Sequence, residues 1–414
     1  MIVRYNGGLP GSAIVGGARG DPCSAIFERG RHTNFEMTPT LAQTPLTTWH
    51  ASHGGRMVDF AGWSMPVQYT SIVAEHQATR ASAGVFDISH MGRLRFDGAG
   101  AAAFLDRLVT RRVSDMRPGR IRYGLVTNDA CGILDDVLVY HLADAAGQSY
   151  YLLVVNAGNR LKILEWIAPR LAAAPDVTMA DVTCDWAMIA VQGPRALALT
   201  QPLVDVELAA MKYYTGREAA IAGQGAIAGV GGIVSRTGYT GEDGCELIVG
   251  ARVVVGIWES LVAAGAVPAG LGCRDTLRLE AAMPLYGHEL SETINPYQAG
   301  LDFAVDLEGR SFTGRDALAQ LKDDTSRPRR VGLVAAGKRA PREGYAILTV
   351  APDGEGRTIG RVTSGTFSPT LDQPIAMGYV EPAFAAPGRH VTIDVRGRPE
   401  PARIAALPFY RRKP

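Results

Sequence analysis

The chain has 414 residues, 47% of them hydrophobic and 20% charged, which is the composition of a globular protein with two or three domains. The formal net charge is +1, so no overall field attracts nucleic acid or an acidic membrane surface. No apolar run approaches the length of a membrane span, so neither a nucleic acid nor a membrane is an expected partner.

Residues 1–36 differ from the rest of the chain. They contain several glycines and arginines, show no apolar periodicity, and lack the apolar core of a secretory signal. We expect a disordered extension ahead of a natural start at Met37. A transit peptide is the alternative, although Asp21, Glu28 and Glu36 argue against it.

Regular structure is expected from about residue 44. Ser71 is placed to cap a helix that runs to about Ala83. Residues 150–155 form an apolar run that predicts a buried strand, and apolar residues then recur at helical spacing over 161–171. These elements predict a first α+β domain over residues 44–180.

Two adjacent carboxylates, Asp135 and Asp136, lie within an apolar stretch over residues 131–140 that predicts a buried strand. A buried carboxylate without a partner is costly. Because side chains alternate across a strand, the two face opposite ways, and Asp136 shares its face with Leu138 and Tyr140. That face would suit a flat ligand with a polar edge. The alternative, which the pair alone favours, is that the two acids merely open the strand near solvent.

Residues 181–325 predict a second α+β domain, with an amphipathic helix over residues 253–262. Strands and helices are intermixed there without a βαβ rhythm, which favours α+β layers over a doubly wound sheet. From Arg329 short strands alternate with turns rich in Gly and Pro, which predicts a small β-barrel or sandwich domain over 329–414. The charged stretch 322–330 is the expected linker.

Glu246 lies in an apolar run after a glycine-rich turn, where an ionised carboxylate needs a partner. It can present two oxygens to the paired N–H donors of a heterocycle. The alternative is a salt bridge to Arg236 or Arg274. Glu242 and Asp243 are expected on the turn itself, solvated and without a role.

Residues 271–280 predict a helix that begins after Gly270. Arg274 lies near its N-terminus, where a cation is unfavourable, and so indicates a carboxylate or an anionic ligand nearby. Arg278 and Glu280 fit a solvated helix face. The histidines show no consistent ligand spacing, so no metal site is expected.

Taken together and in this order, several stretches resemble the T-protein, or aminomethyltransferase, family of the glycine cleavage system over about residues 44–411. They are Arg56–Trp63, Phe86–Met91, Gly132–Tyr140, Val191–Pro194, Arg236–Glu246, Gly270–Glu280 and Thr363–Leu371. The resemblance implies an α+β fold of three domains in a cloverleaf around a central folate-binding hole, with the small β-barrel last.

The resemblance also implies the chemistry. The cofactor would be tetrahydrofolate, and the co-substrate would be an aminomethyl group on the lipoyl arm of the H-protein. The products would be 5,10-methylenetetrahydrofolate, ammonia and the dihydrolipoyl H-protein. Glycine decarboxylase and dihydrolipoyl dehydrogenase would be the other functional partners.

Carried onto this sequence, the resemblance places the catalytic aspartate in the central acidic pair. We assign it to Asp136 from the strand-face argument, with Asp135 as the second choice. Glu246 would hold the amino-pyrimidine edge of the pterin, with Arg274 beside it. The tyrosines expected to line or close the ring pocket are Tyr123, Tyr140, Tyr239 and, from the chain end, Tyr410.

Two other functions stay open. One is a folate-dependent demethylase of the dimethylglycine or sarcosine type, which usually attaches to a flavin domain for which this chain has no room. The other is a non-catalytic folate-binding factor of iron–sulfur assembly, whose Lys-Gly-Cys motif is absent here. A carrier would dock on a local basic patch, for which residues 327–330 and 411–413 are candidates. The expected location is the bacterial cytoplasm, or the mitochondrial matrix only if residues 1–36 are a transit peptide.

Overall fold

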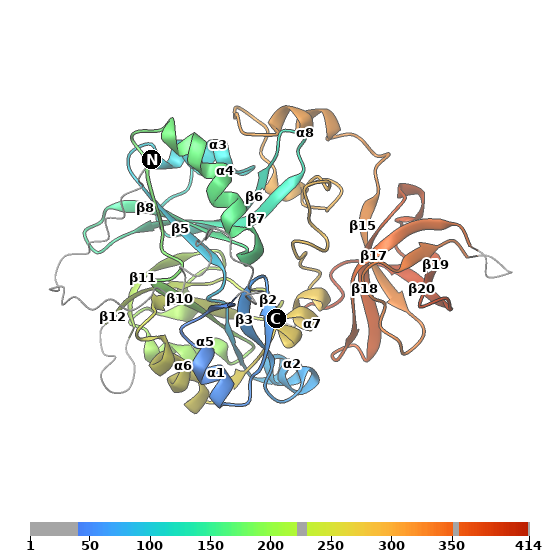
Figure 1. Ribbon diagram of the computed structural model, residues 1–414, viewed down its shortest axis with the longest axis horizontal. Helices are drawn as coiled ribbons and strands as arrows, with labels where there is room; N and C mark the ends of the chain where they lie inside the picture. The colour runs from blue at the N-terminus through green and yellow to red at the C-terminus, as the bar shows by residue number, and fades with distance from the viewer. Residues whose placement is uncertain (1–39, 222–229, 351–355, 413–414) are drawn as a thin grey trace, which may run out of the picture.

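The computed structural model describes residues 40–221, 230–350 and 356–412, and the extension predicted over 1–36 lies outside them. The described chain forms two α+β lobes and a barrel, which meet around helix α7 (Leu271–Glu280) (Figure 1). This three-lobed arrangement confirms the predicted α+β class and the predicted final barrel.

The first lobe is a five-stranded antiparallel sheet with helices α3 (Ala101–Leu108) and α4 (Arg160–Ala172) packed on its outer face. Phe104 and Ile167 from these helices share a core with Val137 of the sheet. The strands, in spatial order, are β6 (Arg120–Thr127), β7 (Ile133–Ala143), β8 (Ser149–Val155), β5 (Gly92–Asp97) and β9 (Thr178–Asp181). The strand predicted around the acidic pair is therefore β7.

The second lobe is a six-stranded sheet covered by α1 (Thr47–Ser52), α5 (Ala196–Thr200) and α6 (Val254–Ala263), and Trp258 of α6 is fully buried. Strand β4 comes before every strand of the first lobe in the sequence, yet it belongs to the second sheet. The expected domain boundary at residue 180 therefore does not separate the two sheets. The strands, in spatial order, are β11 (Gly216–Ile221), β12 (Val230–Ser235), β13 (Gly244–Gly250), β10 (Trp186–Gln192), β4 (Gly84–Asp87) and β14 (Val267–Pro268).

The inner faces of the two sheets share one apolar core. Tyr140 and Leu152 of the first sheet pack there with Met188 and Ile248 of the second. Leu277 of α7 belongs to the same core. Helix α7 therefore closes one side of the space between the sheets, and the barrel lies beyond it (Figure 1).

The last lobe is a closed six-stranded barrel, which α8 (Arg315–Leu321) precedes in the chain. Between α7 and α8 the chain runs through residues 281–314 with only one short helical turn, Asp302–Ala304, and passes between the lobes (Figure 1). The barrel strands, in order around it, are β15 (Arg329–Ala335), β18 (Gln373–Val380), β17 (Thr358–Ser368), β16 (Ala346–Leu348), β19 (His390–Asp394) and β20 (Pro399–Ala405).

A small sheet of β1 (Ala42–Gln43), β3 (Trp63–Gln68) and β2 (Arg56–Phe60) leads into α2 (Ile72–Ala81). The hydroxyl oxygen of Ser71 accepts the N–H of Ala74 at 3.1 Å, so the predicted helix cap is confirmed. Over the described ranges, none of the helices has the length and hydropathy to cross a bilayer.

Arg93, on β5, ties the two α+β lobes together. Its fully buried guanidinium donates to the carbonyl oxygens of Ser89 at 3.0 Å, Met91 at 2.7 Å, Trp186 at 2.7 Å and Thr183. A buried carbonyl group that loses its donor costs about 1–3 kcal/mol. One side chain therefore stabilises the whole junction between the first and second sheets.

We expect Arg93→Met to lower the free energy of unfolding by about 3 kcal/mol or more, because several buried carbonyl groups lose their donor at once. Urea denaturation followed by circular dichroism measures the loss. The matched control is Arg107→Met, because Arg107 is exposed on α3 and its loss should change the value by at most about 0.5 kcal/mol. Equal losses in the two variants would contradict the role of Arg93.

Candidate active site

A cavity of about 320 Å³ lies between the inner faces of the two sheets, beside α7. Leu138 and Val154 of the first sheet and Met188 of the second form apolar walls, and residues 282–285 close it from the segment after α7. The volume falls within the range of pockets that hold small organic ligands, roughly 300–1,000 Å³. Four charged side chains, Asp136, Glu246, Arg274 and Arg330, line this apolar space.

Asp136 is the member of the acidic pair that faces the cavity. Its Oδ1 accepts the side-chain N–H of Asn156 at 2.8 Å, and its Oδ2 accepts the hydroxyl of Tyr123 at 3.2 Å. Asp135 points to the opposite face of β7 and is fully buried there. It accepts the backbone N–H of Asn156 at 3.0 Å and the side-chain N–H of Asn159 at 2.6 Å. The interpretation that the pair merely opens the strand near solvent is wrong.

The acidic pair places two carboxyl groups close together in a buried place. Burial raises the pKa of Asp135, and so does the neighbouring charge of Asp136. Burial also raises the pKa of Asp136, while the hydrogen bonds from Asn156 and Tyr123 and the charge of Arg274 act against that rise. Asn156 donates to Oδ1 of both aspartates at 2.8 Å, so it bridges the pair.

Glu246 faces the cavity from β13 without an ion-pair partner among the described residues. Its Oε2 accepts the hydroxyl of Thr237 at 2.5 Å. Arg236 pairs instead with Asp243 at 2.6 Å, so the predicted alternative of a bridge to Arg236 is wrong. Burial raises the pKa of Glu246, and the Thr237 hydrogen bond and the charge of Arg274 lower it. One carboxylate oxygen is left for a ligand.

Arg274 extends from α7 into the same cavity. Its guanidinium lies over the ring of Tyr239, 4.3 Å from the centroid, and donates no hydrogen bond to any described residue. Burial lowers the pKa of this guanidinium. The hydroxyl of Tyr239 donates to the carbonyl oxygen of Pro284, which fixes the ring beneath the cation. The sequence-based expectation of a nearby carboxylate or anionic ligand fits this unpaired charge.

A second cavity of about 290 Å³ adjoins the first. Tyr239, Arg274 and Leu285 line both cavities and separate them. The second one lies between α7 and the barrel, and Arg342 on the barrel side is exposed with no ion pair or side-chain hydrogen bond to a described residue.

Two of the predicted tyrosines do not line the first cavity. Tyr140 is fully buried behind it, with its hydroxyl 3.5 Å from that of Ser235, because its place on β7 lies deeper between the sheets. Tyr410 lies on the far side of α7, where its hydroxyl donates to Glu242 Oε1 at 2.7 Å and its ring stacks on Arg80 at 3.9 Å. Of the four predicted tyrosines, Tyr123 and Tyr239 meet at the cavity.

The prediction that Glu242, Arg278 and Glu280 are solvated is wrong, because all three are buried and paired. Arg278 donates to Glu289 Oε2 at 2.9 Å, and Arg80 reaches Glu242 at 2.8 Å and Glu280 at 2.7 Å. Arg80 lies 162 residues from Glu242 and 200 from Glu280, and Glu289 lies beyond the end of α7, so periodicity within one helix or turn gave no sign of these pairs.

Asn156, which directly follows the predicted strand 150–155, was not among the predicted site residues. A polar residue at the end of a buried strand, opposite two aspartates, is a signal that could have found it. Phe303 and Arg330 also line the cavity, and neither belongs to a local pattern that would reveal this. Within the described ranges, no group of three or more His, Cys, Asp or Glu side chains could hold a metal ion.

The predicted basic patches are paired only in part. Arg327 forms an ion pair with Asp324 at 3.0 Å, and Arg412 with Asp243 at 3.2 Å. Arg330 lines the cavity instead of the surface patch. Lys413 lies outside the described residues.

Comparison with known proteins gives consistent matches over most of the chain. Residues 46–309 match the family model of the GCVT N-terminal domain, and residues 329–411 match that of the glycine cleavage T-protein C-terminal barrel domain. An aminomethyltransferase of Streptomyces coelicolor is 45% identical over 90% of this chain and 98% of its own length. One from Synechococcus elongatus is 42% identical over 91% and 98%. The crystal structure of the glycine cleavage system aminomethyltransferase T from Bartonella henselae superposes with a TM-score of 0.80, at 32% identity over 89% of this chain and 98% of that one.

We expect Tyr123→Phe to raise the pKa of Asp136 further, because a donor that favours the ionised carboxylate is lost. Carboxyl carbon NMR of aspartate-labelled protein measures the titration. The matched control is Tyr214→Phe, because Tyr214 lines the same cavity without a hydrogen bond to Asp136. An unchanged or lowered pKa of Asp136 in Tyr123→Phe would refute the role of that hydroxyl.

Proposed function

The chain belongs to the glycine cleavage T-protein family, and from that premise we propose that it is the tetrahydrofolate-dependent aminomethyltransferase of the glycine cleavage system. It transfers the methylene of the aminomethyl group on the lipoyl arm of the H-protein to tetrahydrofolate. The products are 5,10-methylenetetrahydrofolate, ammonia and the dihydrolipoyl H-protein. Its functional partners are glycine decarboxylase and dihydrolipoyl dehydrogenase, and its location is the bacterial cytoplasm.

One observation carries the proposal: Asp136, Glu246 and Arg274 face a single cavity, and none has an ion pair with a described residue. Buried charges without partners are costly, so a ligand of matching polarity is the expected partner. The cavity is otherwise walled by apolar and aromatic side chains. A flat heterocycle with polar N–H groups fits that combination.

Glu246 is suited to accept the N–H groups on the amino-pyrimidine edge of a pterin, because one of its oxygens has no donor among the described residues. Arg274 would lie beside the ring, held flat over Tyr239. Tyr123 lines the cavity next to Asp136. Bound tetrahydrofolate supplies the nucleophilic nitrogen to which the one-carbon unit moves.

Asp136 is the proposed catalytic group. Its carboxylate, fixed by Asn156 and Tyr123, stabilises the positive charge that develops on the amine of the transferred group while the thiolate leaves. It acts in a closed apolar space, where a fixed charge is worth more than in water. Asp135, on the far face of β7, orients Asn156 and does not reach the reacting atoms.

The lipoyl arm needs a route to the first cavity. We propose that it passes through the second cavity, between α7 and the barrel, and meets the folate beside Tyr239 and Arg274. Arg342, exposed at that cavity and free of partners among the described residues, is suited to hold an acidic surface of the carrier. This places the docking site away from the basic patches at residues 327–330 and 411–413.

The demethylase and the non-catalytic folate-binding factor remain rivals that one assay separates. Purified protein is mixed with aminomethyl-loaded H-protein and tetrahydrofolate, and ammonia and 5,10-methylenetetrahydrofolate are measured. A demethylase would act on dimethylglycine or sarcosine in its place. A non-catalytic factor would bind the folate without forming either product.

We expect Asp136→Asn to lower kcat by about 100-fold or more while leaving tetrahydrofolate affinity within a few-fold, because the lost charge acts mainly in the transition state. Stopped assays with loaded H-protein and fluorescence titration with tetrahydrofolate measure the two quantities. Asp135→Asn is the matched comparison, with a smaller loss in kcat. Wild-type turnover by folded, folate-bound Asp136→Asn would remove Asp136 from the mechanism.

We expect Arg342→Ala to raise the KM for the loaded H-protein by about two- to fivefold at low ionic strength, and to make that KM less dependent on salt. The affinity for tetrahydrofolate should not change. Arg339→Ala is the control, because Arg339 is exposed on the same loop but lines neither cavity. Equal effects of the two substitutions would argue against docking at the second cavity.

A further inference from the structure

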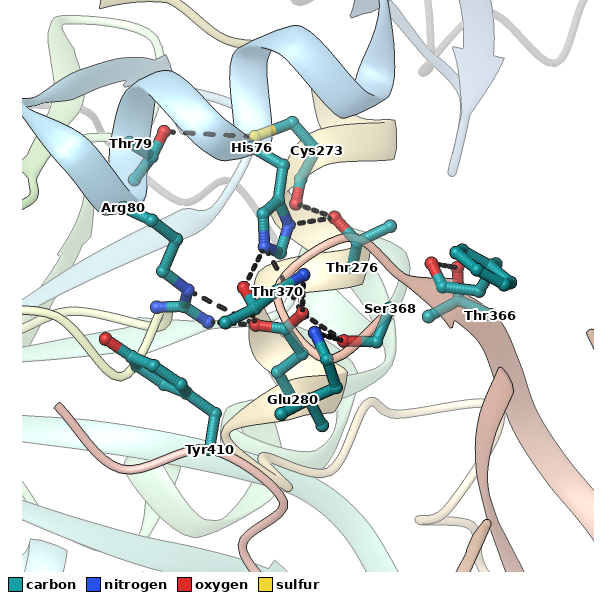
Figure 2. Close-up of polar contacts among 12 residues, drawn as sticks. His76, Thr79, Arg80, Cys273, Thr276, Glu280, Thr366, Ser368, Thr370 and Tyr410 are labelled. Atoms are coloured by element: carbon teal, nitrogen blue, oxygen red, sulfur yellow. Dashed lines mark hydrogen bonds and ion pairs between the residues drawn. The ribbon is translucent and has the colours of Figure 1, made fainter. Parts of the chain in front are cut away.

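Arg80 is the centre of a buried polar cluster on the far side of α7 from the first cavity (Figure 2). It lies in the last turn of α2, and its side chain is 9% exposed. Its Nη2 donates to Glu280 Oε2 at 2.7 Å, and its Nη1 donates to Glu242 Oε1 and to the carbonyl oxygen of Thr240, both at 2.8 Å. Arg80 lines neither cavity, and the proposed reaction does not use it.

The three acceptors of Arg80 belong to two elements that carry cavity side chains. Glu280 is the last residue of α7, and α7 carries Arg274. Thr240 directly follows Tyr239, and Glu242 lies further along the same turn between β12 and β13. Arg274 stacks on Tyr239 at 4.3 Å, and both residues line the two cavities. One guanidinium therefore joins the two elements whose side chains separate the cavities.

The direction of every hydrogen bond from Arg80 is fixed by the chemistry of its side chain. A guanidinium stays protonated and has five N–H donors but no acceptor, so the carboxyl and carbonyl oxygens accept. The donors lie in one rigid plane, and they therefore set the spacing between Glu280 and Thr240. A lysine ammonium at the same place is a point charge and cannot impose that spacing.

The chain end holds Arg80 from its outer side. The ring of Tyr410 lies over the guanidinium, with 3.9 Å between the guanidinium carbon and the ring centroid. The backbone N–H of Tyr410 donates to the carbonyl oxygen of Glu280 at 2.8 Å, and its hydroxyl lies 2.7 Å from Glu242 Oε1. The same two elements are thus joined a second time, and the stacked ring limits the movement of the guanidinium.

The stack of Arg274 on Tyr239 has few direct constraints of its own. Arg274 donates no hydrogen bond to a described residue, so its position depends on the backbone of α7 and on the ring beneath it. The hydroxyl of Tyr239 contacts the carbonyl oxygen of Pro284, in the segment that follows α7. The relative position of α7 and the turn therefore decides whether the cation and the ring meet.

We propose that Arg80 is a positioning residue of the candidate active site, which fixes the stack of Arg274 on Tyr239 by holding α7 and the turn after β12 at one separation. When this link is weakened, the two elements are free to move apart, and the cation leaves the face of the ring. The wall between the two cavities then changes shape. The consequence for folate binding rests on the proposed function, whereas the geometry of the stack does not.

Arginine-selective ¹⁵N labelling of the full chain tests the stack without any ligand. We expect the Nε–H proton of Arg274 to be shifted upfield by the ring current of Tyr239. Arg274→Lys assigns the signal, and Tyr239→Leu gives its position without the ring. We expect Arg80→Lys to remove at least about half of the upfield shift, because the ammonium cannot hold both elements. An unchanged signal in folded Arg80→Lys would overturn the proposal.

Arg160→Lys is the matched control. Arg160 forms an ion pair with Asp181 at 2.6 Å, the two side chains are 12% and 10% exposed, and neither residue lines a cavity. This substitution should leave the signal of Arg274 unchanged, and an equal change in both variants would overturn the proposal. If Arg80→Lys does not fold, Glu242→Gln replaces it, because this variant weakens only the bond to the turn. It should remove part of the upfield shift, and an unchanged signal there would likewise refute the role of Arg80.

Tetrahydrofolate affinity of the same proteins tests the positioning role. We expect Arg80→Lys to weaken binding about fivefold, with a larger change in the KM for tetrahydrofolate than in kcat, and Arg160→Lys to leave both within about twofold. Unchanged affinity in a variant whose Arg274 signal has moved would overturn the role in folate binding. If the wild-type protein binds no folate, the proposed function fails, while the spectra still decide the geometry of the stack.

A double-mutant cycle tests whether Arg80 acts through Arg274. In the Arg274→Lys background, we expect Arg80→Lys to weaken tetrahydrofolate binding by less than about twofold, because the cation that Arg80 positions is already changed. The full loss of about fivefold in that background would show that Arg80 acts by another route, and the proposal would then be wrong.

Discussion

The buried ion pair between Arg80 and Glu280 is the interaction on which the placement of the cavity walls depends. It joins α2 to the end of α7, and the hydroxyls of Ser368 and Thr370 bring the barrel to the same carboxylate. A buried ion pair adds little net stability, because taking two charges out of water offsets most of their attraction. Breaking one is costly, however, so the pair specifies one arrangement of the lobes against others. That arrangement places α7 between the polar cluster and the cavity.

The charged groups on the two sides of α7 differ in whether they form ion pairs. On the barrel side the buried charged groups of α7 have partners: Glu280 with Arg80, and Arg278 with Glu289. On the cavity side Arg274 and the facing Glu246 have no ion pair with a described residue. An unpaired buried charge is unfavourable, so the cavity favours a ligand of matching polarity. The paired charges on the other side hold α7 rigidly and so fix the position of the unpaired groups. A ligand that pairs with these groups is bound in one orientation, as catalysis requires.

Much of this could be predicted from the sequence, wherever the deciding contact is local. The alternation of β7 separated Asp136 from Asp135, and the apolar strand pattern predicted the barrel. The failures share a physical cause. Glu280 looked solvated because the groups that bury it lie about 90 to 200 residues away in the chain. Tyr140 shares a face of β7 with Asp136. The alternation of side chains along a strand predicts which face a residue occupies, but not how deeply it is buried between two packed sheets. The place of β4 in the second sheet likewise depends on its pairing with β10, a strand that follows the whole first lobe in the sequence.

The end of α7 shows how the paired side and the open side are joined. Ala282 follows the helix with φ of 56°, a left-handed conformation that costs a residue other than glycine roughly 1 kcal/mol or more. Its carbonyl oxygen accepts Arg330 Nη1 at 3.0 Å, and the N–H of the next residue, Met283, bonds back to Arg278 at 2.9 Å. These contacts offset the strain and turn the chain sharply, so that residues 282–285 become a wall of the cavity within one turn of Glu280. A helix that ended gradually would carry those residues past the cavity. The contacts at the end of α7 therefore also determine where this wall of the cavity begins.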